Sequence, residues 1–468
     1  MQALNLLQRL IKLLKSKVAL LLIAGLIIRF SIAPFTEHRY DMYIWRLNQV
    51  LAYEYHVNPL NPLTEIDKNA TIFYWSYPPL WLFCLLAVYP LYAMIVNPTY
   101  PIHVSSLWQA MYTTHNPCEA YRSFIPKNLP LLDFLIKFPL ALSDVTIGLL
   151  LFKTIKKFSG KNRAYEYTRL WILNPYVIFI SAVWGMFDSL PALFTMVAIY
   201  FFLQEKYDKS AISLALGALF KMYPILFAPI LSLICCKKSK RVTSALKYLL
   251  ISFGLTLLVL FLANFSFALI FGNHEPLNTS IVLIWQLFKG RASPDWYGSN
   301  IFFGLTPLGA LDILFRFLNV ETNIPISPIL IGFAAMVLLF KIVRRKDFDS
   351  KETFSYVTIA HFIIYLTYSV VNEQYLIWIL PFLLVLSAIM EDIRIKFVYW
   401  IMSLLPLLFI FFHYSDLSYF LSPYYFPSYL GYSTWVPAFG ITATIMYLIG
   451  IIVISKRNEG RVRFAQTF

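Results

Sequence analysis

Residues 18–45, VALLLIAGLIIRFSIAPFTEHRYDMYIW, decide the fold of this chain. The run from 18 to 34 is apolar apart from Arg29 and Ser31, and its length suits a helix that crosses a bilayer. Basic residues precede it between Arg9 and Lys17. The run is longer than the apolar core of a signal peptide and lacks a small-residue cleavage site. We therefore predict a retained first membrane helix, followed by a polar loop over residues 35–76.

The composition is that of a polytopic membrane protein. Of the 468 residues, 59% are hydrophobic and only 13% are charged, whereas about a quarter are charged in a soluble domain. The net charge of +15 lies in short basic clusters between apolar runs. Such clusters are typical of cytoplasmic loops, so no nucleic-acid partner is predicted. The four cysteines show neither a disulfide framework nor a zinc-binding spacing.

The apolar runs predict an all-α bundle of about 10–13 helices, with interfacial helices in the first outward loop. Runs long enough to cross lie at 18–34, 131–152, 168–184, 190–204, 246–271, 326–343, 354–371, 375–390, 397–413 and 437–455. Three further stretches, 77–97 with Pro90, 210–236 with Tyr223-Pro224 and 301–319 with Pro307, are expected to be broken hairpins or interfacial helices. We predict a single domain over 1–468, with the remaining bundle at 77–455 and a basic tail at 456–468.

The basic clusters also predict the orientation. They lie at 9–17, 153–169, 237–247, 341–351, 394–396 and 456–463, and all are assigned to the cytoplasm. The loops on the other side are longer and aromatic, and functional residues concentrate on such loops. The active face is expected to point outward from a prokaryotic plasma membrane or into the lumen of a eukaryotic endoplasmic reticulum.

Asp41 is the leading catalytic candidate. A carboxylate at the mouth of a helix bundle can act on a substrate whose other end is dissolved in lipid. Tyr40, Tyr43 and Trp45 give it a partly apolar setting, which is expected to raise its proton affinity and suit it to proton abstraction. The alternative is a surface ion pair with Arg39 or Arg46. The residue types alone leave the two readings even.

Two further acids have alternative roles. Asp188 lies in an outward turn, and an N-cap for the helix that starts at Ser189 is slightly favoured over a role in the site. Asp144 lies inside an apolar run, where an ionisable group requires a partner or a cavity. It either lines the site or forms half of a buried polar lock.

Lys221 and the pair Glu373-Gln374 are the other polar candidates. Lys221 precedes the predicted helix break, where its ammonium either extends to the headgroups or binds a lipid phosphate. Glu373 and Gln374 occupy an outward tip, where they bind sugar hydroxyls or form a polar turn.

The candidate residues belong to a series of motifs that spans residues 29 to 381. The order of these motifs resembles that of the GT-C glycosyltransferases. It is similar in particular to the catalytic subunit of glycosylphosphatidylinositol mannosyltransferase I and to prokaryotic polyprenyl-phosphate-mannose-dependent mannosyltransferases. The motifs are Tyr40–Trp45, Asn58-Pro59, Tyr74–Trp81, Lys137–Asp144, Leu173–Pro175, Trp184–Ser189, Lys221–Pro224 and Glu373–Pro381.

The resemblance implies a GT-C-like bundle and a sugar donor carried on polyprenyl or dolichyl phosphate. Asp41 would then take the proton of an acceptor hydroxyl, which displaces the lipid phosphate from a hexose in one inverting step. Mannose is favoured, and the acceptor is expected to be a lipid-linked glycan or glycolipid. The phosphate is a good leaving group, so no second carboxylic acid is required. Residues assigned to substrate binding are Lys221, Tyr77, Asp144, Asp188, Glu373, Gln374, Arg29 and Arg291.

One departure from the family concerns metal binding. The paired acids of the family's first loop reduce here to Asp41, with Arg39 where a first acid would stand. This weakens the case for a divalent metal, and no cofactor is predicted. The expected partners are the two lipid substrates and membrane lipids, while the need for a small membrane partner subunit stays open.

Two other classes of function were weighed. A lipid or sugar transporter commonly has paired halves with matching broken helices, and the sequence shows no such symmetry. A non-catalytic membrane subunit of a glycosylation complex is the third option, and Asp41 would be dispensable in it.

Overall fold

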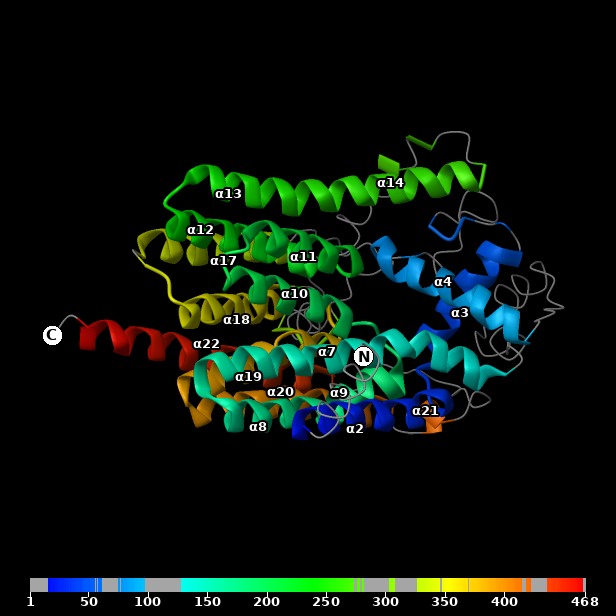
Figure 1. Ribbon diagram of the computed structural model, residues 1–468, viewed down its shortest axis with the longest axis horizontal. Helices are drawn as coiled ribbons and strands as arrows, with labels where there is room; N and C mark the ends of the chain where they lie inside the picture. The colour runs from blue at the N-terminus through cyan, green and yellow to red at the C-terminus, as the bar shows by residue number, and fades with distance from the viewer. Residues whose placement is uncertain are drawn as a thin grey trace, which may run out of the picture.

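The chain forms an elongated bundle in which most helices run along the long axis (Figure 1). The computed structural model describes residues 16–54, 56, 58–60, 75, 77–96, 128–272, 276–277, 280–281, 303–307, 326–345, 347–368, 370–414, 418–421 and 436–465. Seven of the described helices are long and apolar enough to cross a membrane. The prediction of an all-α, multi-pass integral membrane protein is confirmed.

The helices differ in length and regularity. In chain order they are α2 (Lys17–Ile32), α3 (Arg39–Glu54), α4 (Pro79–Val96), α7 (Leu129–Ser159), α8 (Lys161–Ile172), α9 (Pro175–Ile178), α10 (Ser189–Phe202), α11 (Tyr207–Phe220), α12 (Ala228–Ser239), α13 (Val242–Leu249), α14 (Leu255–Ile270), α17 (Ile326–Arg344), α18 (Ser350–Thr367), α19 (Leu380–Met390), α20 (Ile393–Tyr414), α21 (Ser418–Leu421) and α22 (Val436–Ala465). Tighter 3-10 turns form η1 (Ala33–Phe35), η5 (Tyr223–Phe227) and η8 (Glu373–Trp378), and wider π-helical turns form η4 (Phe179–Trp184) and η6 (Leu250–Gly254). A two-residue strand β1 (Phe303–Gly304) pairs in parallel with β2 (Val370–Val371).

The structure corrects two of the predicted spans and confirms a break. Residues 77–97 are not a broken hairpin, because α4 continues through Pro90 as one helix. A proline inside a membrane helix is tolerated where neighbours satisfy the freed backbone groups. Residues 168–184 are not one helix either. Asn174 accepts hydrogen bonds from the backbone of Tyr176 and Val177 and starts a new helix at Pro175. The break in 210–236 is present between α11 and α12, whereas most of 301–319 lies outside the described residues.

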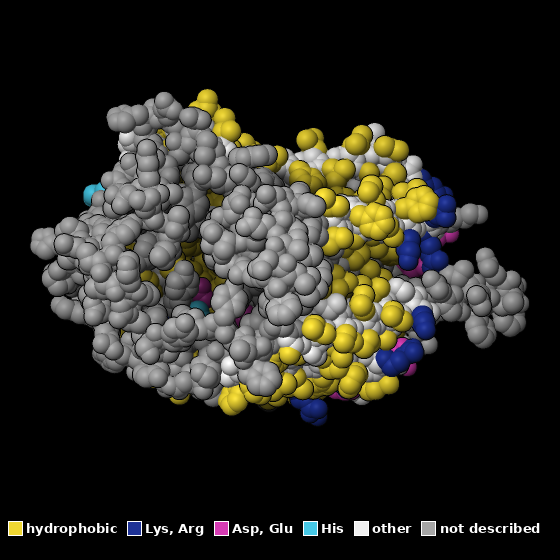
Figure 2. All heavy atoms as spheres, turned by 180° about the vertical axis from the view of Figure 1, so that it is seen from behind, with side chains coloured by type: hydrophobic (Ala, Val, Ile, Leu, Met, Phe, Trp, Pro, Cys, Tyr) yellow, Lys and Arg dark blue, Asp and Glu magenta, His cyan; other side chains and the backbone are white. Residues whose placement is uncertain are grey.

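Helix α19 forms the centre of the bundle. Every one of its residues is buried, and α7, α18 and α20 pack around it. A helix that is apolar on all sides is expected in a protein core or across a membrane, and α19 lies in the core. At the periphery, α14 exposes Leu257, Leu258 and Leu262, and apolar side chains form a wide band around the middle of the molecule (Figure 2). On the face shown there, Lys and Arg gather mainly at the end from which α22 projects.

Three helices cross closely at Ile172. A Cβ atom added to Gly25 of α2 would lie 2.5 Å from Ile172 Cγ2, and one added to Gly148 of α7 would lie 2.6 Å from Ile172 Cδ1. Small residues at such crossings let backbones approach in membranes. This contact fixes the end of α8 against α2 and α7, beneath the region that carries Asp41.

Candidate functional site

Asp41 lies in the first turn of α3, at the end of the bundle opposite the projecting part of α22 (Figure 1). The backbone before it is anchored twice. Glu37 N donates to Phe420 O at 3.0 Å, and His38 N donates to Trp184 O at 3.0 Å. The side chain of Asp41 is 18% exposed. The loop therefore holds a carboxylate at a fixed position, partly open to solvent.

The carboxylate is oriented by an aromatic pair. Asp41 Oδ2 lies 2.9 Å from His38 Nδ1 and accepts a hydrogen bond from Trp184 Nε1 at 2.8 Å. The His38 ring stacks on the Trp184 indole with centroids 4.2 Å apart. A surface ion pair with Arg39 or Arg46 is therefore not the arrangement found: the partner of Asp41 is His38.

The electrostatics of Asp41 also differ from expectation. Burial raises the pKa of Asp41, but the charge of His38, hydrogen bonds from His38 and Trp184, and the charge of Lys221 together lower it below its ordinary value. The predicted rise in proton affinity is wrong, because the polar partners outweigh the apolar surroundings. Asp41 is consequently ionised at neutral pH.

A buried charge cluster supports the loop, and sequence reasoning missed it. Arg46 Nη1 donates to Glu37 Oε2 at 2.6 Å and to Asp133 Oδ1 at 2.9 Å. Arg46 thus joins α3 to α7 through Asp133 and to the preceding loop through Glu37. Beside this cluster the Lys137 ammonium donates to main-chain oxygens of Ala33, Thr36, Ala182 and Val183.

Asp188 and Lys221 form a second, deeper centre. Lys221 Nζ lies 2.7 Å from Asp188 Oδ1, and Trp378 Nε1 donates to the same oxygen at 2.6 Å. The N-cap prediction for Asp188 is wrong, since its side chain makes no capping bond. Lys221 does not extend to the headgroups either, because its side chain is 1% exposed. It follows the last residue of α11 in extended conformation, and the helix break turns it inward.

Aromatic rings surround the Lys221 ammonium. The distances from Nζ to the ring centroids are 4.0 Å for Tyr375, 5.3 Å for Phe187, 5.3 Å for Trp378 and 5.6 Å for Tyr77. Ring faces attract a cation, and these rings come from three separate segments of the chain, since Tyr375 and Trp378 both lie in η8. The charge of Lys221 also contributes to the lowered pKa of Asp41, after the larger effects of His38 and Trp184.

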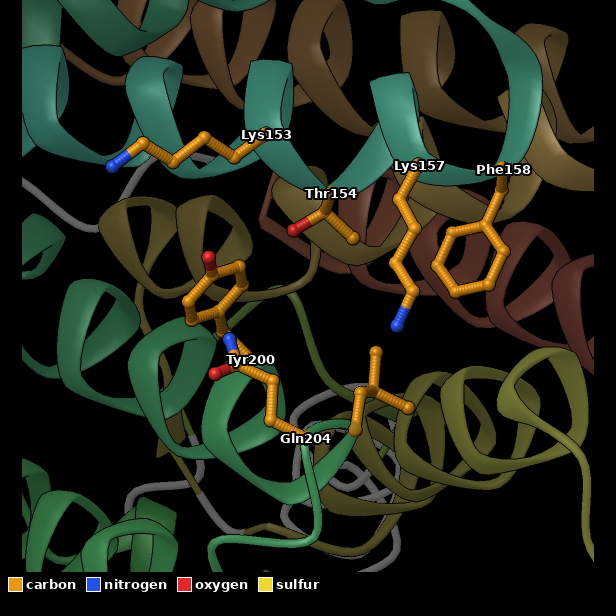
Figure 3. Close-up of a pocket in the computed structure, with 7 residues that line it drawn as sticks. Lys153, Thr154, Lys157, Phe158, Tyr200 and Gln204 are labelled. Atoms are coloured by element: carbon orange, nitrogen blue, oxygen red, sulfur yellow. The ribbon is translucent and has the colours of Figure 1, made fainter.

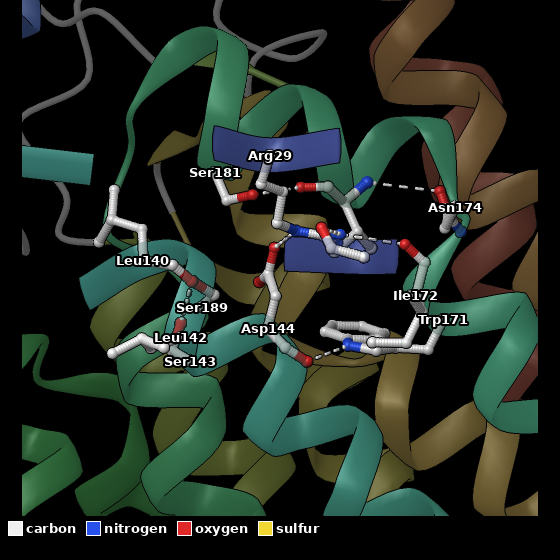
Figure 4. A network of polar contacts seen from close by, with 12 residues as sticks. Arg29, Leu140, Leu142, Ser143, Asp144, Trp171, Ile172, Asn174, Ser181 and Ser189 are labelled. Atoms are coloured by element: carbon white, nitrogen blue, oxygen red, sulfur yellow. Dashed lines mark hydrogen bonds and ion pairs between the residues drawn. The ribbon is translucent and has the colours of Figure 1, made fainter. Parts of the chain in front are cut away.

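Arg29 and Asp144 form a separate buried pair (Figure 4). Arg29 Nε donates to Asp144 Oδ2 at 2.8 Å, with both side chains fully buried. Arg29 Nη1 donates to Gly25 O and Ile172 O, both at 3.1 Å. Trp171 Nε1 donates to the main-chain oxygen of Asp144 at 2.8 Å. This arrangement is the polar-lock alternative for Asp144, and it gives Arg29 a structural partner in place of a phosphate.

The remaining candidates are placed as follows. Glu373 is buried, and its main-chain oxygen accepts a hydrogen bond from Tyr176 OH at 2.5 Å. Gln374 is also buried, and its Oε1 has no hydrogen-bond partner among the described residues. Arg291 lies outside the described residues. In the part of the chain that the structure describes, no cluster of His, Cys, Asp and Glu could hold a metal ion.

Some of the missed site residues had a signal in the sequence. His38 and Asp41 are three positions apart at the start of a helix, a spacing that brings side chains together. Trp184, Tyr375 and Trp378 lie inside the quoted motifs, although their contacts were not predicted. Glu37 and Asp133 had no comparable signal, because Asp133 lies 87 positions from Arg46, the residue that joins the two acids.

Comparisons with known proteins agree with the motif order. Residues 82–294 match the family model of the GPI transamidase subunit PIG-U. A GPI mannosyltransferase 1 of Candida albicans is 26% identical over 255 residues, covering 52% of this chain and 60% of the relative. One of Aspergillus oryzae is 34% identical over 91 residues, covering 19% of this chain and 22% of the relative. The chain is similar to GPI mannosyltransferases 1.

The resemblance drawn from the motifs is thus confirmed. These matches span less than two thirds of either relative's length. A solved structure, the apo oligosaccharyltransferase of Archaeoglobus fulgidus, superposes with a TM-score of 0.40 at 10% identity, covering 95% of this chain and 56% of that chain.

Proposed function

We propose that this protein is a membrane glycosyltransferase that moves a hexose, most simply mannose, from a polyprenyl or dolichyl phosphate to a lipid-linked glycan or glycolipid. Similarity to GPI mannosyltransferases 1 supports the class of reaction. The observation that carries the proposal is the Asp41 carboxylate, which is ionised, partly exposed and fixed at the rim of the bundle. A site of this kind can receive a hydroxyl from solvent or headgroups and a lipid from between helices.

Asp41 acts as the general base. His38 and Trp184 both contact Oδ2, so Oδ1 is the oxygen that faces an acceptor hydroxyl. The hydroxyl proton passes to Asp41 as its oxygen bonds to the anomeric carbon, and the bond from that carbon to the phosphate oxygen breaks. The electron pair leaves with the polyprenyl phosphate. One such displacement inverts the anomeric centre.

The centre around Asp188 and Lys221 supplies a positive electrostatic field and the contacts to the sugar. Lys221 is buried and already paired with Asp188, so we assign it a fixed positive field that keeps Asp41 ionised and attracts the donor phosphate. The half-buried ring of Tyr77 offers a face for the sugar. Gln374 Oε1 is placed to accept a hydrogen bond from a sugar hydroxyl. Asp188 positions Lys221, and Arg29 with Asp144 locks the helices beneath.

The active face is outward or lumenal in this proposal. Asp41 lies at the end opposite the basic residues seen in Figure 2, and basic loops face the cytoplasm. The similarity to GPI mannosyltransferases 1 favours the endoplasmic reticulum membrane.

Replacing Asp41 with Asn tests the proposal because it removes the base and keeps the shape. Purified protein is incubated with radiolabelled polyprenyl-phosphate mannose as the donor and with a synthetic glycosylinositol phospholipid or a membrane lipid extract as the acceptor. Polyprenyl-phosphate glucose is added as a competing donor. We expect transfer to fall by about 10²- to 10⁴-fold with an unchanged unfolding midpoint. Asp208→Asn is the matched control, since Asp208 is an exposed partner of Lys247. Full turnover by the Asp41 variant would refute the assignment.

The family match favours a second function, a non-catalytic membrane subunit of a GPI-processing complex. That match covers residues 82–294 and therefore leaves out Asp41. Under this function the wild-type chain transfers no mannose, and Asp41→Asn leaves the level of GPI-anchored protein in the host unchanged. The same pair of variants therefore separates the two functions.

A further inference from the structure

A pocket of about 240 Å³ lies between α7 and α10 (Figure 3). The side chains of Thr154 and Lys157 point from α7 toward Tyr200 of α10 and Gln204 of the turn that follows it. Lys153 adds a second ammonium one helical turn from Lys157. Both lysines are exposed, so they form the mouth of the pocket, while Thr154 lies at its floor.

This pocket is remote from Asp41. Helix α7 contacts the Asp41 region through Asp133 and reaches the pocket at Lys153, twenty residues further along. That separation corresponds to about 30 Å of helix, the thickness of the hydrocarbon core of a bilayer. The pocket therefore lies at the opposite membrane face, at the end where basic residues gather (Figure 2).

The polar groups of the pocket suit an anion. None of its lining residues is acidic. Thr154 is 3% exposed, and its hydroxyl has no hydrogen-bond partner among the described residues. A buried donor of this kind normally has a partner, because leaving it unsatisfied is unfavourable. Lys206 donates to Gln204 Oε1 at 2.9 Å and brings a third ammonium to the rim.

Three other basic residues at this end are paired with acids. Lys396 pairs with Glu166 at 2.9 Å, Lys247 pairs with Asp208 at 2.7 Å, and Arg163 pairs with Glu391. Within the described part of the chain, Lys153 and Lys157 take part in no ion pair. Lys156 and Lys161 also take part in no ion pair there, so the buried, unsatisfied Thr154 hydroxyl beside Lys153 and Lys157 is what distinguishes the pocket from the surrounding basic surface.

We infer that this pocket binds the phosphate group of an anionic phospholipid headgroup at the face opposite Asp41. The Thr154 hydroxyl and the ammonium groups of Lys153 and Lys157 bind the phosphate oxygens. Phe158 and Leu203 supply apolar contacts next to them, which fits a headgroup whose acyl chains continue along the apolar band. The inference is independent of the proposed transferase reaction.

Binding can be measured from the unfolding midpoint of the purified full chain in neutral detergent. The protein is titrated with short-chain phosphatidic acid, with short-chain phosphatidylcholine and with inorganic phosphate. We expect phosphatidic acid to raise the midpoint and phosphatidylcholine to leave it unchanged. Lys153→Gln/Lys157→Gln should weaken binding about 30-fold, and Thr154→Val should weaken it about fivefold.

The control variant is Lys156→Gln/Lys161→Gln, which removes the same charge from exposed positions that do not line the pocket. It should bind phosphatidic acid as the wild type does, and Lys153→Arg/Lys157→Arg should retain binding. An equal response to inorganic phosphate that depends on the pocket would support the anion site with free phosphate as its source. Equal losses in the control and pocket variants, or no response to either phosphate compound, would overturn the inference.

Discussion

Two of the buried ion pairs in the bundle have nearly the same separation and different surroundings. Arg29–Asp144 and Lys221–Asp188 have separations of 2.8 and 2.7 Å, and no side chain in either pair is more than 1% exposed. Around Arg29 the further partners are main-chain oxygens of Gly25 and Ile172. Lys221 is surrounded by aromatic rings instead.

The difference shows that burial of a charge pair does not by itself mark a functional site. The Asp144 carboxylate of α7 and the main-chain oxygens of Gly25 in α2 and Ile172 in α8 accept hydrogen bonds from Arg29, so the pair links α2, α7 and α8. Lys221 lies in a cage built by three segments, and it contributes to the lowered pKa of Asp41. We therefore propose the first pair as a structural lock and the second as part of the site.

The largest effect is expected when one partner of the Arg29–Asp144 pair is replaced. Arg29→Met leaves the Asp144 carboxylate buried without its counter-ion, which should lower the free energy of unfolding by about 3–5 kcal/mol. The double variant Arg29→Met/Asp144→Leu removes both charges and should recover most of that loss. Chemical unfolding in one detergent measures both. A double variant as unstable as the single one would contradict the lock.

Single and double substitutions of the Lys221–Asp188 pair should separate its effect on stability from its effect on activity. Lys221→Met should reduce mannose transfer by about 10²-fold, because the field at the reacting phosphate is lost. Lys221→Met/Asp188→Leu should regain the unfolding midpoint and remain inactive. Recovery of mannose transfer in the double variant would mean that the Lys221–Asp188 pair has only a structural role, as proposed for Arg29–Asp144.

Much of the fold could be predicted because the bilayer fixes the length of apolar runs. The expected 18–34, 131–152 and 397–413 spans correspond to α2, α7 and α20. Local interruptions were harder to predict. Pro90 indicates a break by local rules, yet α4 continues through it, while Asn174 and Pro175 divide a run that hydropathy alone treats as continuous.

The candidate residues could be named from the sequence, but their contacts could not. Asp41, Asp188 and Lys221 were proposed from residue type and position. Their partners were not, because a buried polar group is satisfied by tertiary packing. Trp378 is 190 positions from Asp188, and Trp184 is 143 positions from Asp41. The Asp188 side chain binds such distant partners and does not cap the helix that follows it.

A smaller effect is expected from the partner of Asp41. His38→Gln removes the neighbouring charge that lowers the pKa of Asp41, so that pKa should rise. Asp41 works as the carboxylate and is lost as a base when pH falls through its pKa. The acid limb of kcat/KM should therefore move to higher pH. His56→Gln, at an exposed histidine, should leave the limb in place.

The smallest effect is expected from Gln374, and it tests whether the cage around Lys221 receives the sugar. Gln374→Leu keeps the volume and removes an oxygen that has no partner among the described residues. Because nothing in that region loses a hydrogen bond, the unfolding midpoint should not fall. If Oε1 accepts a hydroxyl of the donor sugar, KM for polyprenyl-phosphate mannose should rise about fivefold with kcat little changed. An unchanged KM would remove Gln374 from the sugar site, and a falling midpoint would assign it to the packing of the core.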